Sequence, residues 1–273
     1  MLSRAAILYT RADAERSRVL VRKYFAAFCA HGAVPELMIV DRLSPGSVLA
    51  ALRGADFIIN RTRDAELASF LENAGLLVSN PSVLTRTAND KLLTYELLHG
   101  AVPMLETFIC GDRPPLPFPF VAKPAAGHGG SGVSMIKSEA DYAAYRAAHP
   151  EKSVCQPLCD TLGRDMRVYV IGGRPAAAVM RESETDFRSN FSLGGRAVPI
   201  SAGGIPKAAL EIVGRVCEAL PLDYAGVDVM PHAGGWVLNE IEDPVGARML
   251  YINGLLDPAA EHAKYLLRLR GSI

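Results

Sequence analysis

The chain has 273 residues, of which 49% are hydrophobic and 21% are charged, so it carries enough apolar material for a sizeable core. Lys and Arg together number 29, as do Asp and Glu, and the formal net charge is zero. This balance removes the electrostatic argument for non-specific nucleic-acid binding, which needs a basic surplus. No uncharged apolar run approaches the roughly 18 residues of a membrane span. We therefore expect neither a nucleic acid nor a membrane as a partner.

The cysteines indicate a reduced, cytoplasmic protein. They number five, and the apolar run between Arg4 and Thr10 is too short for the core of a signal peptide. An odd count without an export signal is typical of thiols that stay reduced. The close pair Cys155 and Cys159 lacks the second pair of a zinc site, which disfavours metal binding there. The five are Cys29, Cys110, Cys155, Cys159 and Cys217.

Residues 1–85 alternate between short apolar runs and helical patterns, which predicts an N-terminal α/β domain with a parallel sheet. One helix is expected to begin at Asp13, and another to span residues 66–75 and end at Gly75. Strands are expected at residues 5–9, 35–40, 56–60 and 76–80.

Residues 86–155 predict a small lid domain that contains a glycine-rich loop. A helix is expected over residues 87–100 and another over 138–149. Strands are expected at residues 102–109, 120–123 and 133–136, with a Pro-rich linker at 113–119.

Residues 156–273 predict a C-terminal domain built on an antiparallel sheet. Two hairpins are expected, one over residues 166–182 with its turn at Gly172 and Gly173, the other over 224–242. Helices are expected over residues 206–220 and 257–269. The fold class is therefore α/β, with an α+β arrangement in the C-terminal part.

The segment FVAKPAAGHGGSGVSMI contains a GxGxxG string, but its context excludes the common glycine motifs. A dinucleotide-binding motif needs a helix after the last glycine, whereas Val133 begins a predicted strand. A protein kinase places its lysine after the loop, whereas Lys123 precedes it. What remains is a strand with a lysine and a flexible loop whose backbone N–H groups can close over phosphates. The alternative is an ordinary hairpin with a solvent-facing lysine.

Three carboxylates converge in the second hairpin. Alternation puts Glu240 and Glu242 on one face, and a turn near residue 234 places Asp228 opposite Glu240. Carboxylates so close repel one another unless a cation neutralises them, and hard oxygen ligands suit Mg²⁺. The alternative is the solvated face of an edge hairpin.

In this order, the lysine, the glycine loop and the paired carboxylates resemble the ATP-grasp ligases, specifically the RimK-like branch. The resemblance extends over most of the chain. It implies the ATP-grasp fold and two cofactors, ATP and Mg²⁺, with Mn²⁺ as the alternative ion. The matching segments are NDKLL, FVAKPAAGHGGSGV, VCQPL, GRDMRVYVIGGRPAAAVMRE, DFRSNFSLGG, YAGVDV and VLNEIEDPVG.

The resemblance also assigns roles to individual residues. It places the nucleotide phosphates at two lysines and the glycine loop, the adenine at a hinge strand, and the ribose at an acid nine residues beyond Gln156. Catalytic roles fall on Arg188, Asn190 and Lys123. The nucleotide-binding residues it implies are Lys91, Lys123, Gly129, Gly130, Ser131, Gln156, Pro157, Leu158, Asp165, Arg188 and Asn190, and the metal ligands are Asp228, Glu240 and Glu242.

The chain departs from the family pattern at Glu242, where the family normally has Asn. A carboxylate there still suits a metal ion but adds negative charge near the phosphates.

The resemblance implies an ATP-dependent ligase that joins a carboxylate to an amine through an acyl-phosphate and releases ADP and phosphate. Two alternatives remain: a kinase on the same fold, and a nucleotide-binding regulator without turnover. The family further implies an amino acid or a peptide as substrate, and we allow for a homo-oligomer. Cations that suit a substrate carboxylate are Arg61 and Arg63, after the third strand, and Arg248. Alternatively, Arg61 and Arg63 are simply arginines exposed in a loop.

Overall fold

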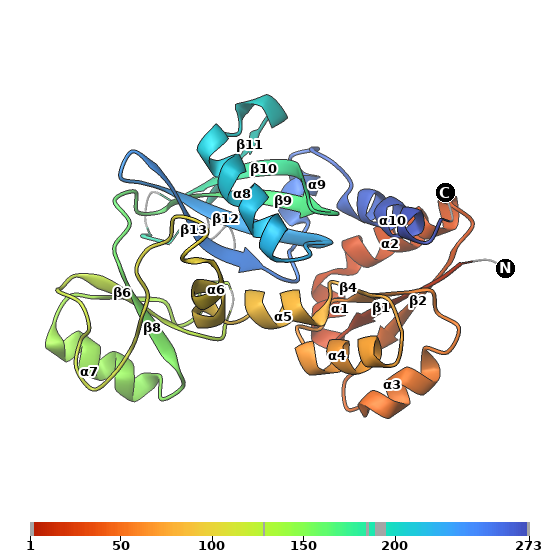
Figure 1. Ribbon diagram of the computed structural model, residues 1–273, viewed down its shortest axis with the longest axis horizontal. Helices are drawn as coiled ribbons and strands as arrows, with labels where there is room; N and C mark the ends of the chain where they lie inside the picture. Colours follow the sequence, from red (N-terminus) through yellow and green to blue (C-terminus); the bar gives the residue numbers. More distant parts are fainter. Residues whose placement is uncertain (1–2, 128, 184–185, 189–194, 272–273) are drawn as a thin grey trace.

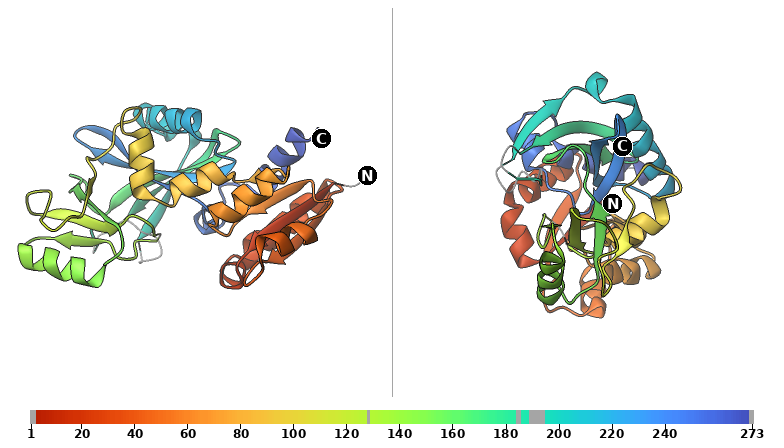
Figure 2. Two further views of the ribbon diagram at one scale, coloured as in Figure 1. Left: turned by 60° about the horizontal axis from the view of Figure 1, so that its bottom comes forward. Right: turned by 90° about the vertical axis from the view of Figure 1, so that its left-hand side faces the viewer.

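The computed structural model describes residues 3–127, 129–183, 186–188 and 195–271. Its strands form three sheets (Figure 1). Figures 1 and 2 show the N-terminal sheet and the lid at opposite ends of the molecule, with the C-terminal sheet between them. Within the described ranges, no helix is both long and apolar enough to cross a bilayer.

The N-terminal sheet is parallel, as predicted, with the strand order β2-β1-β3-β4. Alternate residues of the central strand β1 point into two different cores, Ala5 and Ile7 into one and Ala6 and Leu8 into the other, because side chains alternate along a strand. The strands are β1 (Arg4–Tyr9), β2 (Val34–Ile39), β3 (Phe57–Asn60) and β4 (Val78–Ser79).

Helices cover both faces of this sheet. The predicted helix from Asp13 is two helices that meet at Ser17; the side chain of Thr10 caps the first, and the second buries Leu20, Tyr24 and Phe28. The last helix of the chain, α10 (Pro258–Leu269), packs on the same face, beside α2. The others are α1 (Arg11–Arg16), α2 (Arg18–Ala30), α3 (Pro45–Ala51) and α4 (Ala65–Asn73).

The helix expected over residues 87–100 is wrong in its extent. The structure has α5 (Ser82–Ala88) and α6 (Lys91–Leu98), separated at Asn89 and Asp90. Asp90 is the N-cap of α6, and its carboxylate accepts hydrogen bonds from the backbone N–H groups of the next turn at 2.8 and 3.2 Å. This cap begins a new helix at the first of the two predicted phosphate-binding lysines.

The lid is a four-stranded antiparallel sheet with the order β5-β8-β6-β7, covered by α7 (Glu139–Ala148). Tyr142 and Tyr145 of this helix pack against Phe120 and Ile136. The first strand is much shorter than the predicted 102–109. The strands are β5 (Phe108–Ile109), β6 (Phe120–Pro124), β7 (Ser134–Ile136) and β8 (Ser153–Pro157).

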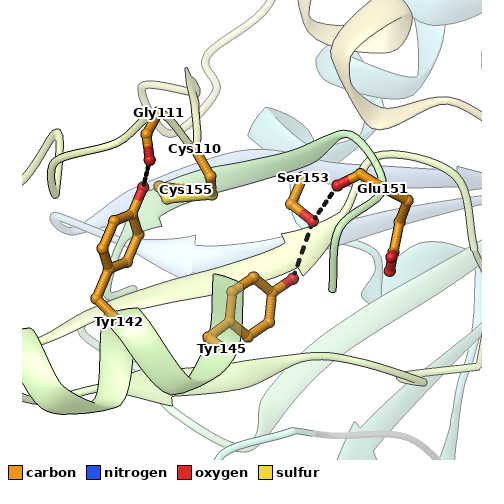
Figure 3. Close-up of a disulfide and its surroundings, with 7 residues drawn as sticks. All are labelled: Cys110, Gly111, Tyr142, Tyr145, Glu151, Ser153 and Cys155. Carbon is orange, nitrogen blue, oxygen red and sulfur yellow. Dashed lines mark hydrogen bonds between the residues drawn. A yellow bond between two sulfur atoms is a disulfide. The ribbon is translucent and has the colours of Figure 1, made fainter. Parts of the chain in front are cut away.

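A disulfide joins Cys110 to Cys155 in the lid (Figure 3), so the expectation that all five thiols stay reduced is wrong. The two residues are 45 positions apart in the sequence. They meet because β5 pairs with β8, and the N–H of Cys110 continues that ladder by donating to the carbonyl of Ser153. Both lie in the buried core of the lid beside Tyr142, whose hydroxyl donates to the carbonyl of Gly111.

The C-terminal sheet is antiparallel, as predicted, with the order β11-β10-β9-β12-β13. Gly172 and Gly173 turn the first hairpin with φ of +58° and +71°, values that glycine adopts without strain. One face of the sheet packs on α8 (Lys207–Ala219). The strands are β9 (Arg164–Ile171), β10 (Arg174–Glu182), β11 (Arg196–Ile200), β12 (Tyr224–His232) and β13 (Gly235–Glu242); the short helices η2 (Ala202–Gly204) and α9 (Arg248–Ile252) complete the chain.

The predicted domain limits at residues 85/86 and 155/156 stay predictions. The lid sheet ends with β8 at Pro157, close to the second limit. The helix α10, which we assigned to the C-terminal domain, packs in the core of the N-terminal sheet.

Candidate active site

A cleft lies between the lid sheet and the C-terminal sheet, with about 850 Å³ of empty space, part of it open to solvent. One wall comes from β6 and β8, and the other from β9, β10, β12 and β13. Many of the predicted nucleotide and metal residues line it. They are Lys91, Lys123, Gly130, Ser131, Gln156, Pro157, Asp165, Arg188 and Glu240.

Alternation along four neighbouring strands creates a charged face toward this cleft. On β9, Asp165 and Arg167 point to one side, while Met166 and Val168 point into the core under α8. Arg167 lies directly opposite Asp228 of β12, and Asp165 lies opposite Arg181 of β10. The sheet thus buries a row of opposite charges in register.

Two arginines neutralise the buried carboxylates in this row. Asp228 is fully buried and accepts hydrogen bonds from Arg167 at 2.7 Å to each oxygen and from Arg181 at 2.5 Å. Burial favours the protonated acid, but the two guanidiniums outweigh it and hold the pKa of Asp228 below its ordinary value. The sequence pattern predicts that a metal ion balances the negative charge of these carboxylates. It did not identify either arginine as a partner. The alternative of a solvated hairpin face is wrong, because Asp228 has no exposed surface.

Arg181 extends the row to Asp165, to which it donates through Nε at 2.7 Å and through Nη2. Asp165 is 2% exposed, although it lines the cleft. Burial raises the pKa of its carboxyl above the ordinary value even with the arginine beside it. The residue predicted for the ribose is therefore linked through one guanidinium to the predicted metal ligand Asp228.

Glu240 is the carboxylate that faces the cleft without a paired guanidinium. Among the residues that the structure describes, it accepts no hydrogen bond and forms no ion pair within 4 Å. Burial, followed by the nearby charges of Asp228 and Glu242, raises its pKa, while Lys91 and Lys123 act in the opposite direction. A group in this position gains most from a bound cation.

A β-bulge explains why Asn239 lines the cleft next to Glu240. Asp228 pairs with Glu240, but Val229 pairs with Leu238, so Asn239 is an extra residue on β13. Strict alternation sends adjacent residues to opposite faces of a strand, so the sequence pattern did not predict that Asn239 lines the cleft together with Glu240.

The carboxylates of Asp228, Glu240 and Glu242 fit a magnesium ion. One ligand atom from each lies within 4.8 Å of the others, and all are hard oxygens, the ligands that Mg²⁺ prefers. Glu242, where the chain departs from the family pattern, also accepts a hydrogen bond from Arg167 at 3.0 Å. The extra negative charge is therefore partly offset inside the protein.

Two lysines face these carboxylates across the cleft. Lys123 on β6 is 6% exposed, so the alternative of a solvent-facing lysine is wrong. Burial lowers the pKa of Lys123 to about 8, with Glu240 opposing the shift and Lys91 adding to it. Lys91 begins α6, and its Nζ donates to the carbonyl of Gly127 at 2.9 Å.

Gly130 and Ser131 of the glycine-rich segment line the same cleft as the two lysines. Gly130 and Gly132 have φ of +78° and +69°, and a Cβ on Gly132 would lie 2.8 Å from the ring of Pro124. Arg188 reaches this loop through a 3.2 Å hydrogen bond to the carbonyl of Gly130, while Asp186 accepts from its Nε and Nη2. The loop and the arginine are thus in direct contact.

The other end of the cleft is apolar. Leu105, Val121 and Met230 line it beside Pro157, and the side chain of Gln156 donates to Thr107 at 2.7 Å. Val121 could have been predicted to line the cleft, because it lies two residues before Lys123 on the same face of the strand. Such a surface suits a flat aromatic base next to a charged phosphate-binding end.

Other predicted residues lie elsewhere. Gly129, Leu158, Asp228 and Glu242 are not among the residues that line the cleft, although the last two adjoin Glu240, and Asn190 lies outside the described residues. Arg61 is 4% exposed and donates to the carbonyl of Val245 at 2.5 Å and to Tyr9, so the alternative of an exposed loop arginine is wrong for it. Arg63 pairs with Asp13 at 3.5 Å, and Arg248 is an exposed residue at the start of α9.

The sequence profile of the RimK-like ATP-grasp domain matches residues 93–266. The chain belongs to the RimK-like ATP-grasp family. This match covers most of the lid and the whole C-terminal sheet, the two walls of the cleft.

Curated relatives of this RimK-like chain include two named "Probable alpha-L-glutamate ligase". The one from Xanthomonas oryzae pv. oryzae is 32% identical over 190 residues, which are 64% of this chain and 63% of that protein. The one from Stenotrophomonas maltophilia is 28% identical over 226 residues, 78% of this chain and 76% of that protein. The match to the first thus spans less than two thirds of the relative's length.

Solved structures confirm the ATP-grasp fold. A RimK domain protein from Sphaerobacter thermophilus superposes with a TM-score of 0.72 at 22% identity, over 97% of this chain and 100% of that one. A D-alanine–D-alanine ligase from Bacillus anthracis superposes with a TM-score of 0.74 at 13% identity, over 100% and 99%. At these identities the likeness concerns the fold of the RimK-like chain alone.

Proposed function

We propose that this RimK-like protein is an ATP-dependent ligase that joins a carboxylate to an amine and releases ADP and phosphate. The observation that supports it is the meeting of Lys91, Lys123, Arg188 and the free carboxylate Glu240 in one cleft with an apolar end. The apolar end takes the adenine, and the cations take the phosphates.

The reaction brings two anions together. A substrate carboxylate oxygen forms a bond to the γ-phosphorus of ATP while the bond from that phosphorus to ADP breaks. The amine nitrogen then bonds to the acyl carbon, the carbon–oxygen bond to phosphate breaks, and the amine loses a proton to solvent. Lys91, Lys123 and Arg188 reduce the repulsion in the first step.

The glycine loop has a second task. The acyl-phosphate reacts readily with water, so the loop from Gly127 to Gly132 must cover the site during turnover. Its contacts with Lys91 and Arg188 couple loop closure to the residues that hold the phosphates.

A magnesium ion held by Asp228, Glu240 and Glu242 would neutralise phosphate charge and align the phosphates. The arginine pairs keep Asp228 ionised, and Glu240 remains available to the ion.

For the substrates, we propose an amino acid or a peptide, with L-glutamate as the first amino acid to test, because the curated relatives are named as glutamate ligases. A screen of amino acids and peptides identifies the second substrate.

The test is a screen of ADP release with glutamate and other amino acids or peptides, paired as acid and amine. Hydroxylamine replaces the amine in a parallel set, where an acyl-phosphate gives a hydroxamate. A hydroxamate, together with ADP and phosphate, supports the ligase. A stable phosphate ester without hydroxamate would instead establish a kinase, and ATP binding without any ADP release would indicate a regulator.

A further inference from the structure

A second group of side chains of the kinds that bind metal ions lies at the rim of the cleft, where the segment after β8 meets the end of β12. Cys159 and Asp160 follow β8, and His232 ends β12. One ligand atom of each lies within 4.8 Å of the others. We propose that the thiol of Cys159, the carboxylate of Asp160 and the imidazole of His232 together bind one zinc ion.

The distances suit a shared ion. His232 Nδ1 lies 3.0 Å from Asp160 Oδ1, and Cys159 Sγ lies 3.9 Å from the same oxygen. Ligand atoms around a tetrahedral zinc ion lie about 3.3 to 3.6 Å from one another, given bond lengths of about 2.0 to 2.3 Å. Shifts of about 1 Å therefore bring the three atoms onto one ion.

The backbone already holds these side chains in place. The N–H of Ala233 donates to Asp160 Oδ2 at 2.8 Å, which leaves Oδ1 directed at His232. The two oxygens of the Asp160 carboxylate are thus each held by a different contact, Oδ2 by the backbone and Oδ1 by the imidazole. Little ordering is needed when the ion arrives, which favours binding.

Zinc replaces the proton of Cys159, which passes to solvent. The thiol donates to the carbonyl of Pro231 at 3.1 Å. The hydroxyl of Thr161 donates to the same carbonyl, so this oxygen stays satisfied when the thiol proton leaves. The ion displaces the contact between His232 and Asp160 and binds both.

The ligand set separates this site from the carboxylate cluster. Thiolate and imidazole favour zinc over magnesium, whereas three carboxylates favour magnesium. Three protein ligands leave the fourth position to water. The side chains of Asp160 and His232 are 54% and 30% exposed, so the ion enters from solvent, while Cys159 covers the inner side at 8% exposure.

The sequence reading disfavoured zinc here because it looked for a second cysteine pair. The third ligand comes instead from His232, which is 72 residues away from Asp160 and reaches it through the register of the C-terminal hairpin.

The experiment titrates the whole protein with Co²⁺ and then Zn²⁺ in excess Mg²⁺ and without nucleotide, so that the carboxylate cluster is occupied. The wild-type protein should bind one Co²⁺ with a thiolate-to-metal charge-transfer band in the near ultraviolet and with release of about one proton. Zn²⁺ should then displace the Co²⁺ and remove the band without further proton release. Cys159→Ser should abolish the band. Asp160→Asn and His232→Gln should each weaken Zn²⁺ binding by about 10- to 100-fold.

Cys217→Ser is the matched control, because Cys217 is a partly buried free thiol outside the site. It should leave the band and the Zn²⁺ affinity unchanged. Circular dichroism of each variant shows whether it folds, and the exposed Asp160→Asn change tests the site even if Cys159→Ser does not fold. The proposal is overturned if folded wild type shows no thiolate band, or if Asp160→Asn and His232→Gln bind Zn²⁺ as tightly as the Cys217→Ser control.

Discussion

The guanidinium of Arg167 holds the carboxylate of Asp228 through two hydrogen bonds, Nε to Oδ1 and Nη2 to Oδ2, both 2.7 Å long. Both side chains are almost fully buried. Replacing one residue of such a pair by an uncharged one leaves the other charge buried without a partner.

Arg167→Met should therefore lower the free energy of unfolding by about 3–5 kcal/mol in metal-free buffer. Added Mg²⁺ should recover part of the loss, because it supplies positive charge to Asp228. Urea denaturation with and without Mg²⁺ measures both effects. Arg164→Met is the control, since Arg164 forms a solvent-exposed pair with Glu182; a loss at Arg167 no larger than at Arg164 would contradict the role of the pair.

Glu240 and Asp228 should respond in opposite directions to removal of charge. Glu240→Gln takes away a carboxylate that has no partner among the described residues and whose pKa is raised by burial and by two neighbouring carboxylates, so the protein should become more stable in EDTA. Asp228→Asn leaves two buried arginines without their partner and should be destabilised by about 3–5 kcal/mol. Thermal unfolding in EDTA distinguishes them, and both variants should lose the stabilisation that Mg²⁺ gives the wild type. Equal destabilisation by the two changes would show that Glu240 has an internal partner.

Nucleotide binding should depend on pH through Lys123, whose pKa is lowered to about 8. The charged lysine binds phosphate, so ATP affinity measured in EDTA should fall as pH rises above about 8, and binding there should take up a proton. Lys123→Arg should remove this dependence, because arginine stays charged. Lys123→Met should weaken ATP binding about 10- to 100-fold, the loss of one charge-assisted hydrogen bond.

Calorimetry in buffers of different ionisation enthalpy measures the proton uptake. The exposed Lys137→Met variant is the control and should bind ATP as the wild type does. Unchanged affinity in Lys123→Met would exclude Lys123 from the phosphate site.

Acid should destabilise the protein through His262. This side chain is buried between Tyr24 and Ser79, each 2.8 Å from one of its ring nitrogens, and burial lowers its pKa to about 3. Below pH 6.5 the unfolded chain binds a proton that the folded protein does not. The free energy of unfolding should therefore fall as the pH decreases from 6.5 toward 3, by up to about 1.4 kcal/mol per pH unit.

His262→Gln keeps hydrogen-bonding groups but does not titrate, so its stability should change less steeply with pH than that of the wild type. Denaturation at several pH values tests this, with the exposed His31→Gln as the control. If the free energy of unfolding changes with pH to the same extent in the wild type and in His262→Gln, His262 is not the group responsible for the acid sensitivity.

Reduction should destabilise the lid. The disulfide Cys110–Cys155 closes a segment of 45 residues, for which chain entropy gives about 4 kcal/mol. Thermal unfolding with and without reductant measures the effect, and Cys110→Ala should match the reduced protein, whereas the exposed Cys29→Ala should not change stability. Alkylation of the denatured, unreduced protein should modify three of the five cysteines; modification of all five would refute the bridge.

Short-range patterns predicted much of this molecule. The turn near residue 234 placed Asp228 opposite Glu240, and the structure has that pair in register. The Gly172–Gly173 turn likewise fixed the first hairpin. The first hairpin follows from its own turn and from alternation. Asp228 meets Glu240 only because the bulge at Asn239 shifts the register by one residue, since the pairs nearer the turn, such as Val229 with Leu238, would continue to Asp228 with Asn239.

Features that depend on distant pairing were missed. Arg167 and Asp228 meet because β9 pairs with β12, and Cys110 and Cys155 meet because β5 pairs with β8. No local pattern specifies which strands become neighbours in a sheet. The bulge at Asn239 was missed for a different reason: it breaks the alternation on which the prediction rested.

The packing of α10 on α2 sets an order for synthesis. Tyr24 and Phe28 leave the ribosome well before Ala263 and Leu266, which complete their core. At about 5–20 residues per second the N-terminal sheet waits roughly 10 to 50 s with α2, but not yet α10, packed on the face that the two helices share. During that interval the apolar residues of α2 that α10 later covers are exposed, and a chaperone that binds such residues would protect the nascent chain.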